Sequence, residues 1–131
     1  MKNQISFMTD LFESGIAKQA AANDLLLGGD LAQWLIGKSK GGEFTFTGPT
    51  QDQTGWSDSA RSEGQEFKLG FEIAHSSVGA GYAEWHITID NGRRWGVLPS
   101  KNSAVRGRLC DHIHNVLRDE YKVRELQWTD D

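Results

Sequence analysis

Regular alternation of apolar and polar residues is the clearest pattern in the chain, and it occurs twice. From Glu66 to His75 and again from Tyr82 to Asp90, every second residue is apolar. Successive side chains of a strand point to opposite faces of a sheet, so each stretch predicts a β-strand with one buried face. Residues 76–81, a segment of small residues with two glycines, would form a loose connection between the two strands.

The dipeptide Asn91-Gly92 follows the second strand directly and predicts a β-hairpin from Tyr82 to Leu98. A type I′ turn needs positive φ at both central residues, which Asn and Gly tolerate best. Directly paired residues share a face. One face of this hairpin would therefore carry Trp85, Ile87, Ile89 and Leu98, and the other Glu84, His86, Thr88, Trp95 and Val97.

Residues 1–38 have a helical spacing of apolar positions, which predicts a pair of helices. Asp10 to Glu13 fits a capping box, and Phe12 extends a stripe that Ile5 and Met8 would begin. The second helix of the pair would be short, from Leu31 to Ile36, with Asp30 as its cap.

Residues 100–121 predict a further helix, because their apolar residues fall on one arc at 100° per residue. Arg106 falls inside that arc, so its charged group must reach solvent or meet a partner. Residues 122–131 would form a short closing strand or a tail against the domain.

The middle of the chain is harder to interpret. Residues 43–47 alternate and predict a short strand, which Gly48-Pro49 would end. Residues 48–65 are polar and punctuated by glycine, and predict a long loop, with a helical turn at 57–63 as the alternative. A loop of this length is often functional or disordered.

These elements predict an α+β fold in one domain, 1–131. It would contain an N-terminal helical pair, a three- or four-stranded antiparallel meander over 43–98, and a C-terminal helix packed on the sheet. The core would consist largely of Phe44, Phe46, Phe67, Leu69, Phe71, Ile73, Trp85, Ile87, Ile89, Leu98, Leu109, Ile113 and Leu117.

Composition supports a folded protein and limits its location. The chain has 37% hydrophobic residues, 13 aromatic residues (five Trp, six Phe and two Tyr) and a single cysteine, Cys110. One cysteine cannot form an internal disulfide, which favours a reducing compartment. No segment is long and apolar enough for a membrane span or a signal peptide. We therefore expect a cytoplasmic protein without a membrane partner or cofactor.

Charge is unevenly distributed along the chain. Residues 1–92 hold 6 Lys/Arg and 12 Asp/Glu, whereas residues 93–124 hold 8 and 3. A helix N-terminus close to cations is a natural anion site. The candidate anion-binding residues are therefore Arg93, Arg94, Lys101, Arg106 and Arg108. The alternative is that this basic region faces the acidic part of the same protein.

Candidate catalytic and metal-binding residues are few. Glu84 and His86 share one strand face and are suited to general acid–base chemistry, but no nucleophile motif accompanies them. His112 and His114 lie about 200° apart on a helix and cannot bind one ion, so we expect no metal site. Cys110 lies on the apolar arc and is expected to be a core residue.

The pattern favours a non-enzymatic binding protein acting through protein–protein contact, such as an inhibitor, adaptor or immunity-type factor. Exposed aromatic and arginine residues often anchor such interfaces. Anion or nucleic-acid binding through the basic 93–108 region is the alternative, and a small enzyme using Glu84 and His86 is a third. Exposed strand edges would also permit a homodimer. The candidate partner-binding residues are Trp56, Arg61, Arg93, Arg94 and Trp95.

Overall fold

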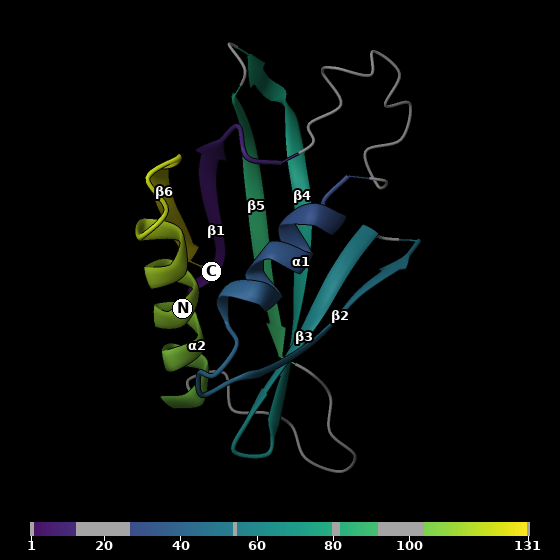
Figure 1. Cartoon of the computed structure of the whole chain (residues 1–131), viewed down its shortest axis with the longest axis vertical. Helices are drawn as coiled ribbons and strands as arrows, with labels where there is room; N and C mark the ends of the chain where they lie inside the picture. Colours follow the sequence, from purple (N-terminus) through teal and green to yellow (C-terminus); the bar gives the residue numbers. More distant parts are fainter. Residues whose placement is uncertain (1, 13–26, 54, 80–81, 92–103, 131) are drawn as a thin grey trace.

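The two helices in the described part of the chain lie on the same face of one antiparallel sheet (Figure 1). A computed structural model describes residues 2–12, 27–53, 55–79, 82–91 and 104–130. The six strands follow the order β2-β3-β4-β5-β1-β6, so β2 and β6 form the edges. In chain order the elements are β1 (Lys2–Thr9), α1 (Gly29–Lys38), β2 (Thr45–Asp52), β3 (Gly55–Ser62), β4 (Gln65–Gly79), β5 (Tyr82–Asn91), α2 (Ala104–Arg118) and β6 (Val123–Asp130).

The predicted N-terminal helical pair is wrong, because residues 2–9 form strand β1. Ile5 and Phe7 are completely buried, while Gln4 and Ser6 on the other face are half-buried. This is the period of two that a strand requires. Residues 13–26 lie outside the described residues, so α1 is the one helix described in the N-terminal segment.

Two strands replace most of the long loop predicted over residues 48–65. β2 and β3 pair in antiparallel register, and β3 pairs with β4 from Trp56 to Ser62. The β3–β4 turn has two central residues with positive φ, Glu63 at 50° and Gly64 at 74°, as a type I′ hairpin requires. The alternative of a helical turn at 57–63 is also wrong.

The predicted strand at Tyr82–Asp90 is confirmed as β5, but its predicted neighbour is not. Trp85 pairs with Ile73 of β4 on one side and with Phe7 of β1 on the other. Both edges of β5 are therefore occupied, which contradicts the predicted pairing of Trp85 with Leu98. Gly92 and residues 93–98 lie outside the described residues, so the turn at Asn91-Gly92 stays a prediction.

The strand predicted at 66–75 and the C-terminal helix are confirmed as β4 and α2. The closing segment, predicted as a short strand or a tail, is strand β6 and pairs with β1, so the sheet has six strands and the predicted three- or four-stranded meander is wrong. One apolar core fills the space between the sheet and the two helices, and joins Leu31 and Leu35 of α1 to Leu109 and Ile113 of α2. Most of the predicted core residues belong to it, although Phe46 is only half-buried and Leu98 lies outside the described residues.

A close contact fixes α1 against β3. The ring of Trp56 lies over Gly29, the first residue of the helix, where an added Cβ would come 2.9 Å from Cε2 of the indole. Carbon atoms do not pack this closely, so the contact depends on a residue without a side chain.

Replacing Gly29 by Ala should lower the free energy of unfolding by about 1–3 kcal/mol, because the methyl group overpacks Trp56. The matched control is Gly37 in the same helix, where an added Cβ meets nothing within 4 Å. Gly37→Ala should raise stability by about 0.5–1 kcal/mol through helix propensity. Urea denaturation measures the free energy of unfolding of both variants. A Gly29→Ala variant that is more stable than the wild type would contradict the contact.

Candidate functional site

The face of the sheet opposite the helices is the principal candidate site, and we call it the open face. The register places one residue from each of β4, β5 and β1 in the cross-strand rows of Glu84, His86 and Thr88. Its side chains are mainly polar and half-buried, unlike the apolar side chains on the covered face. The open face consists of Gln4, Ser6, Met8, Glu72, Tyr82, Glu84, His86, Thr88 and Arg124.

A histidine between two carboxylates occupies the middle of the open face. His86 Nε2 lies 2.5 Å from Glu84 Oε2, and His86 Nδ1 lies 3.7 Å from Glu72 Oε1. The side chain of His86 is 20% exposed, and that of Glu72 is 65% exposed. The structure thus brings together Glu84 and His86, as their spacing on one strand indicates, and adds Glu72 from β4.

Ser6 is opposite His86 in the same cross-strand row, which gives the row the composition of a serine–histidine–acid triad. The hydrogen bonds do not follow a triad. Ser6 Oγ donates to the carbonyl of Gln127 at 3.4 Å, and His86 Nε2 is paired with Glu84. A triad requires the hydroxyl to bond to the imidazole. The geometry therefore offers an ion-pairing surface rather than an activated nucleophile.

A cluster of interface-type residues lies beside this histidine. Arg124 of β6 donates a hydrogen bond to the hydroxyl of Tyr82 at 2.8 Å, and its guanidinium lies 4.6 Å from the ring centroid. Met8 pairs with Arg124 on one side and with Glu84 on the other. We call Met8, Tyr82, Glu84 and Arg124 the Tyr82 cluster. Sequence reasoning missed it, because three strands far apart in the chain supply its residues.

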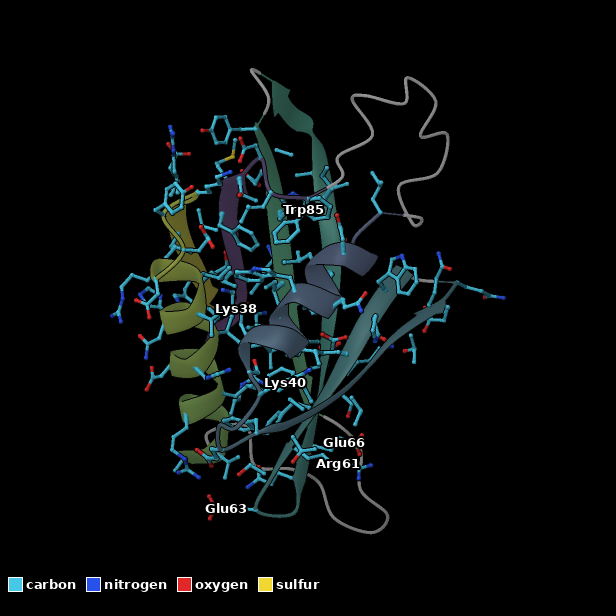
Figure 2. The ribbon with its side chains drawn as sticks, viewed as in Figure 1. Lys38, Lys40, Arg61, Glu63, Glu66 and Trp85 are labelled. Carbon is cyan, nitrogen blue, oxygen red and sulfur yellow. The ribbon has the colours of Figure 1, made fainter. Side chains whose placement is uncertain are left out.

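Of the predicted partner-binding residues, Trp56 and Arg61 are described and lie apart from each other. Trp56 is half-buried against Gly29 on the covered face. Arg61 is on the opposite face of β3 and pairs with Glu66 of β4 at 3.5 Å, beside it in Figure 2. Arg93, Arg94 and Trp95 lie outside the described residues.

Two of the predicted anion-binding residues are described, and both make contacts within the protein. Arg106 is 4% exposed and donates to the carbonyl of Ile89 at 3.3 Å. Arg108 donates three hydrogen bonds to Glu43, from Nε at 2.9 and 3.1 Å and from Nη2 at 2.9 Å. Its Nη2 also donates to Glu63, which Figure 2 labels at the tip of the β3–β4 hairpin. The Arg108 hydrogen bond lowers the pKa of Glu43. Arg93, Arg94 and Lys101 are outside the described residues.

The histidines of α2 connect it to other elements. His112 Nε2 lies 2.8 Å from Ser39 Oγ, which donates its own proton to the Leu35 carbonyl at 2.7 Å. His112 therefore donates to Ser39 and joins the two helices. His114 Nδ1 accepts a hydrogen bond from the indole of Trp128 at 3.2 Å. Cys110 is buried, as its place on the apolar arc of the helix predicts. Within the described ranges, no group of three His, Cys, Asp or Glu side chains is placed to hold a metal ion.

Two hollows lie near the β2 edge, and neither is lined by Glu84 or His86. The first, of about 300 Å³, has hydroxyl and charged groups around it from β2, β3 and β4. The second, of about 520 Å³, lies along the β3–β4 hairpin and includes Arg61, Glu63 and Glu66.

Asp58 of β3 is the most unusual ionisable residue among those described. Only 2% of it is exposed, and neither carboxyl oxygen has a hydrogen-bond partner. Burial alone raises the pKa of Asp58 to about 8. The sequence pattern placed Asp58 in a loop. The two-residue spacing of Trp56, Asp58 and Ala60 would have indicated a strand, but an acidic residue at the central position does not look like a core residue.

Comparison with known proteins gives no relative: no family model, curated protein or solved structure matches this chain. Neither α1 nor α2 is long and apolar enough to cross a membrane, and the same holds for every helix in the described part of the chain.

The burial of His112 makes stability depend on pH. Burial lowers the pKa of His112 below 6.5, against a smaller opposing effect of the Glu43 charge. Below pH 6.5 the His112 imidazole therefore becomes protonated in the unfolded chain while it stays neutral in the folded protein. The free energy of unfolding should then fall as the pH decreases. His112→Gln should weaken this dependence between pH 7.5 and 5. Chemical denaturation across that range measures it, with Asp111→Asn on the exposed side of α2 as the control; identical profiles for His112→Gln and wild type would refute the assignment.

Proposed function

We propose that this protein is a non-enzymatic binding protein that contacts a protein partner through the open face of its sheet. The observation that carries the proposal is the gathering of the Tyr82 cluster on the face opposite α1 and α2. Tyr, Arg and Met are enriched in protein–protein interfaces, and the largest contributions to binding come from such residues.

The charges of the open face favour a partner with basic side chains. At the other end of the sheet, Lys68 lies 3.6 Å from Asp52 and Arg61 lies 3.5 Å from Glu66, so these carboxylates already face cations. Glu72 and Glu84 instead share His86 between them. A lysine or arginine of a partner would complete this arrangement, and a complementary pair of this kind favours specificity and association rate.

The same geometry weighs against the two alternatives. Arg106 and Arg108, the described members of the basic region, bond to a carbonyl and to carboxylates of the protein itself. That use of the cations is unfavourable for anion or nucleic-acid binding, which depends on neutralising phosphate. A catalytic role for Glu84 and His86 is disfavoured because the Ser6 hydroxyl bonds to the Gln127 carbonyl, and His86 Nε2 is paired with Glu84.

Affinity capture with matched variants tests the proposal. The tagged wild-type protein should recover a protein partner in stoichiometric amount from a native lysate. Tyr82→Ala and Arg124→Ala should each weaken binding by about tenfold or more, as expected for interface anchors. Tyr121→Ala is the control, because this side chain is 84% exposed and lies outside the open face.

Two results would contradict the proposal. One is a partner that the Tyr82→Ala and Arg124→Ala variants retain and Tyr121→Ala loses. The other is the absence of any stoichiometric partner from lysates of several growth conditions. Circular dichroism and thermal unfolding of each variant establish that a loss of binding is not a loss of the fold.

A further inference from the structure

The buried carboxyl of Asp58 lies where the pairing between two strands is interrupted. Thr47 pairs with Ser59, and the next pair is Thr50 with Ser57, so Gly48 and Pro49 form a bulge opposite Asp58. Gly48 has φ of 121°, and a Cβ added there would lie 3.0 Å from Asp58 Oδ1. The bulged backbone of β2 is thus packed directly against the carboxyl group.

The surroundings of Asp58 provide no compensation for a negative charge. It points to the covered face, together with Trp56 and Ala60 on β3, and its partner on β4 is Leu69. The carboxyl oxygens have no hydrogen-bond partner among the described groups, and burial is the one cause that raises the pKa. An ionised carboxylate in such a place is strongly unfavourable, because it loses water and gains no partner.

Three charged residues of the neighbouring strands, Asp52, Glu66 and Lys68, line the same hollow as Asp58. On β4, Glu66 and Lys68 belong to the opposite face, and on β2 Asp52 pairs with Lys68 at 3.6 Å. On α1, which also contacts β2, β3 and β4, the charged residues are Asp30 and Lys38 near its two ends, whereas its buried side is apolar. Burial of Asp58 therefore decides its protonation.

β2 is the element that can open to admit water. It is an edge strand, bonded along one side to β3, and its ladder is broken at the bulge. β3 and β4 are held on both sides by neighbouring strands. Local opening occurs where few backbone hydrogen bonds must break, which here is the bulge opposite the carboxyl.

We propose that β2 is a proton-linked edge of the sheet: while Asp58 holds a proton β2 stays closed, and when Asp58 loses it β2 opens and the carboxylate becomes hydrated. The ionised form is stable only where water reaches it, so deprotonation and opening are thermodynamically coupled. The device is separate from the Tyr82 cluster, because β3 and β4 lie between β2 and the strands that supply that cluster.

The coupling has a definite sign and size. In the opened state Asp58 regains an ordinary pKa near 3.8, and in the closed state the pKa is about 8. The equilibrium for opening should then rise about tenfold per pH unit from pH 6 towards pH 8 and level off above it. Between pH 6 and pH 9 the total increase is on the order of a hundredfold.

Amide hydrogen exchange of residues 45–52 between pH 6 and pH 9, corrected for the intrinsic base-catalysed rate, tests the proposal. In the wild type the exchange should accelerate by about a hundredfold over this range. Asp58→Asn, which keeps the shape but cannot ionise, should abolish the acceleration. Asp52→Asn is the matched control on the same strand and should keep it. The side-chain carboxyl carbon of Asp58, followed by NMR, should titrate far above 3.8.

Three results would overturn the proposal. The first is an identical pH dependence in wild type and Asp58→Asn. The second is equal acceleration in β2, β5 and β1, which would mean global unfolding rather than local opening. The third is titration of the Asp58 carboxyl near its ordinary value of 3.8. If Asp58→Asn fails to fold, the wild-type comparison of β2 with β5 and the carboxyl titration decide the question.

Discussion

The position of β1 between β5 and β6 is the constraint on which the rest of the structure depends. Its residues pair with β5 from Gln4 to Thr9 and with β6 from Lys2 to Thr9, so the first strand joins the last to the sheet. Ile5 and Phe7 complete the apolar surface that Trp85 and Ile87 begin, and both helices pack on that surface. Because the fully buried apolar residues of β1 and β5 point to the covered face, the opposite face carries mainly polar residues. The open face is thus a consequence of where β1 inserts.

Sequence patterns predicted the elements in which apolar residues recur regularly over many positions. They missed the strands in which this pattern is short or is interrupted by a polar residue. β4 and β5 each carry a regular series of buried apolar residues, and α2 presents one apolar arc. β1 has only Ile5 and Phe7, and Ile5 also fits a helical stripe with Met8 and Phe12, so the local signal was ambiguous. Pairing with strands more than 70 residues away in the chain resolves that ambiguity, and local patterns carry no record of it. In β3 the buried positions hold Asp58 and Ala60, which no hydropathy pattern identifies as a core face.

The candidate sites were predictable to the extent that their residues are neighbours in the chain. Glu84 and His86 are two positions apart on a strand, and the structure brings them together. The Tyr82 cluster depends on β1, β5 and β6 meeting, so its residues gave no common signal in the sequence. The basic region illustrates the reverse case. Arg108 looked like a cation for an external anion, but Glu43 and Glu63 come from a loop and a hairpin that fold back to it. Charge counted along a chain does not show which charges will meet.

Asp58 is the one carboxyl among the buried side chains of β3. The free energy that its burial costs indicates that Asp58 does more than fill space in the core. Removing one buried, unpaired polar group and filling its space with an apolar side chain of similar size is often neutral or stabilising. Asp58 has no hydrogen-bond partner among the described groups and lies opposite the interrupted part of the β2–β3 ladder. The folded protein is thus less stable with this carboxyl than it would be with an apolar side chain of similar size. Local rules of this kind are broken mainly at strained or functional positions. Within the sheet, β3 and β4 separate this edge strand from β1, β5 and β6, the strands that supply the Tyr82 cluster.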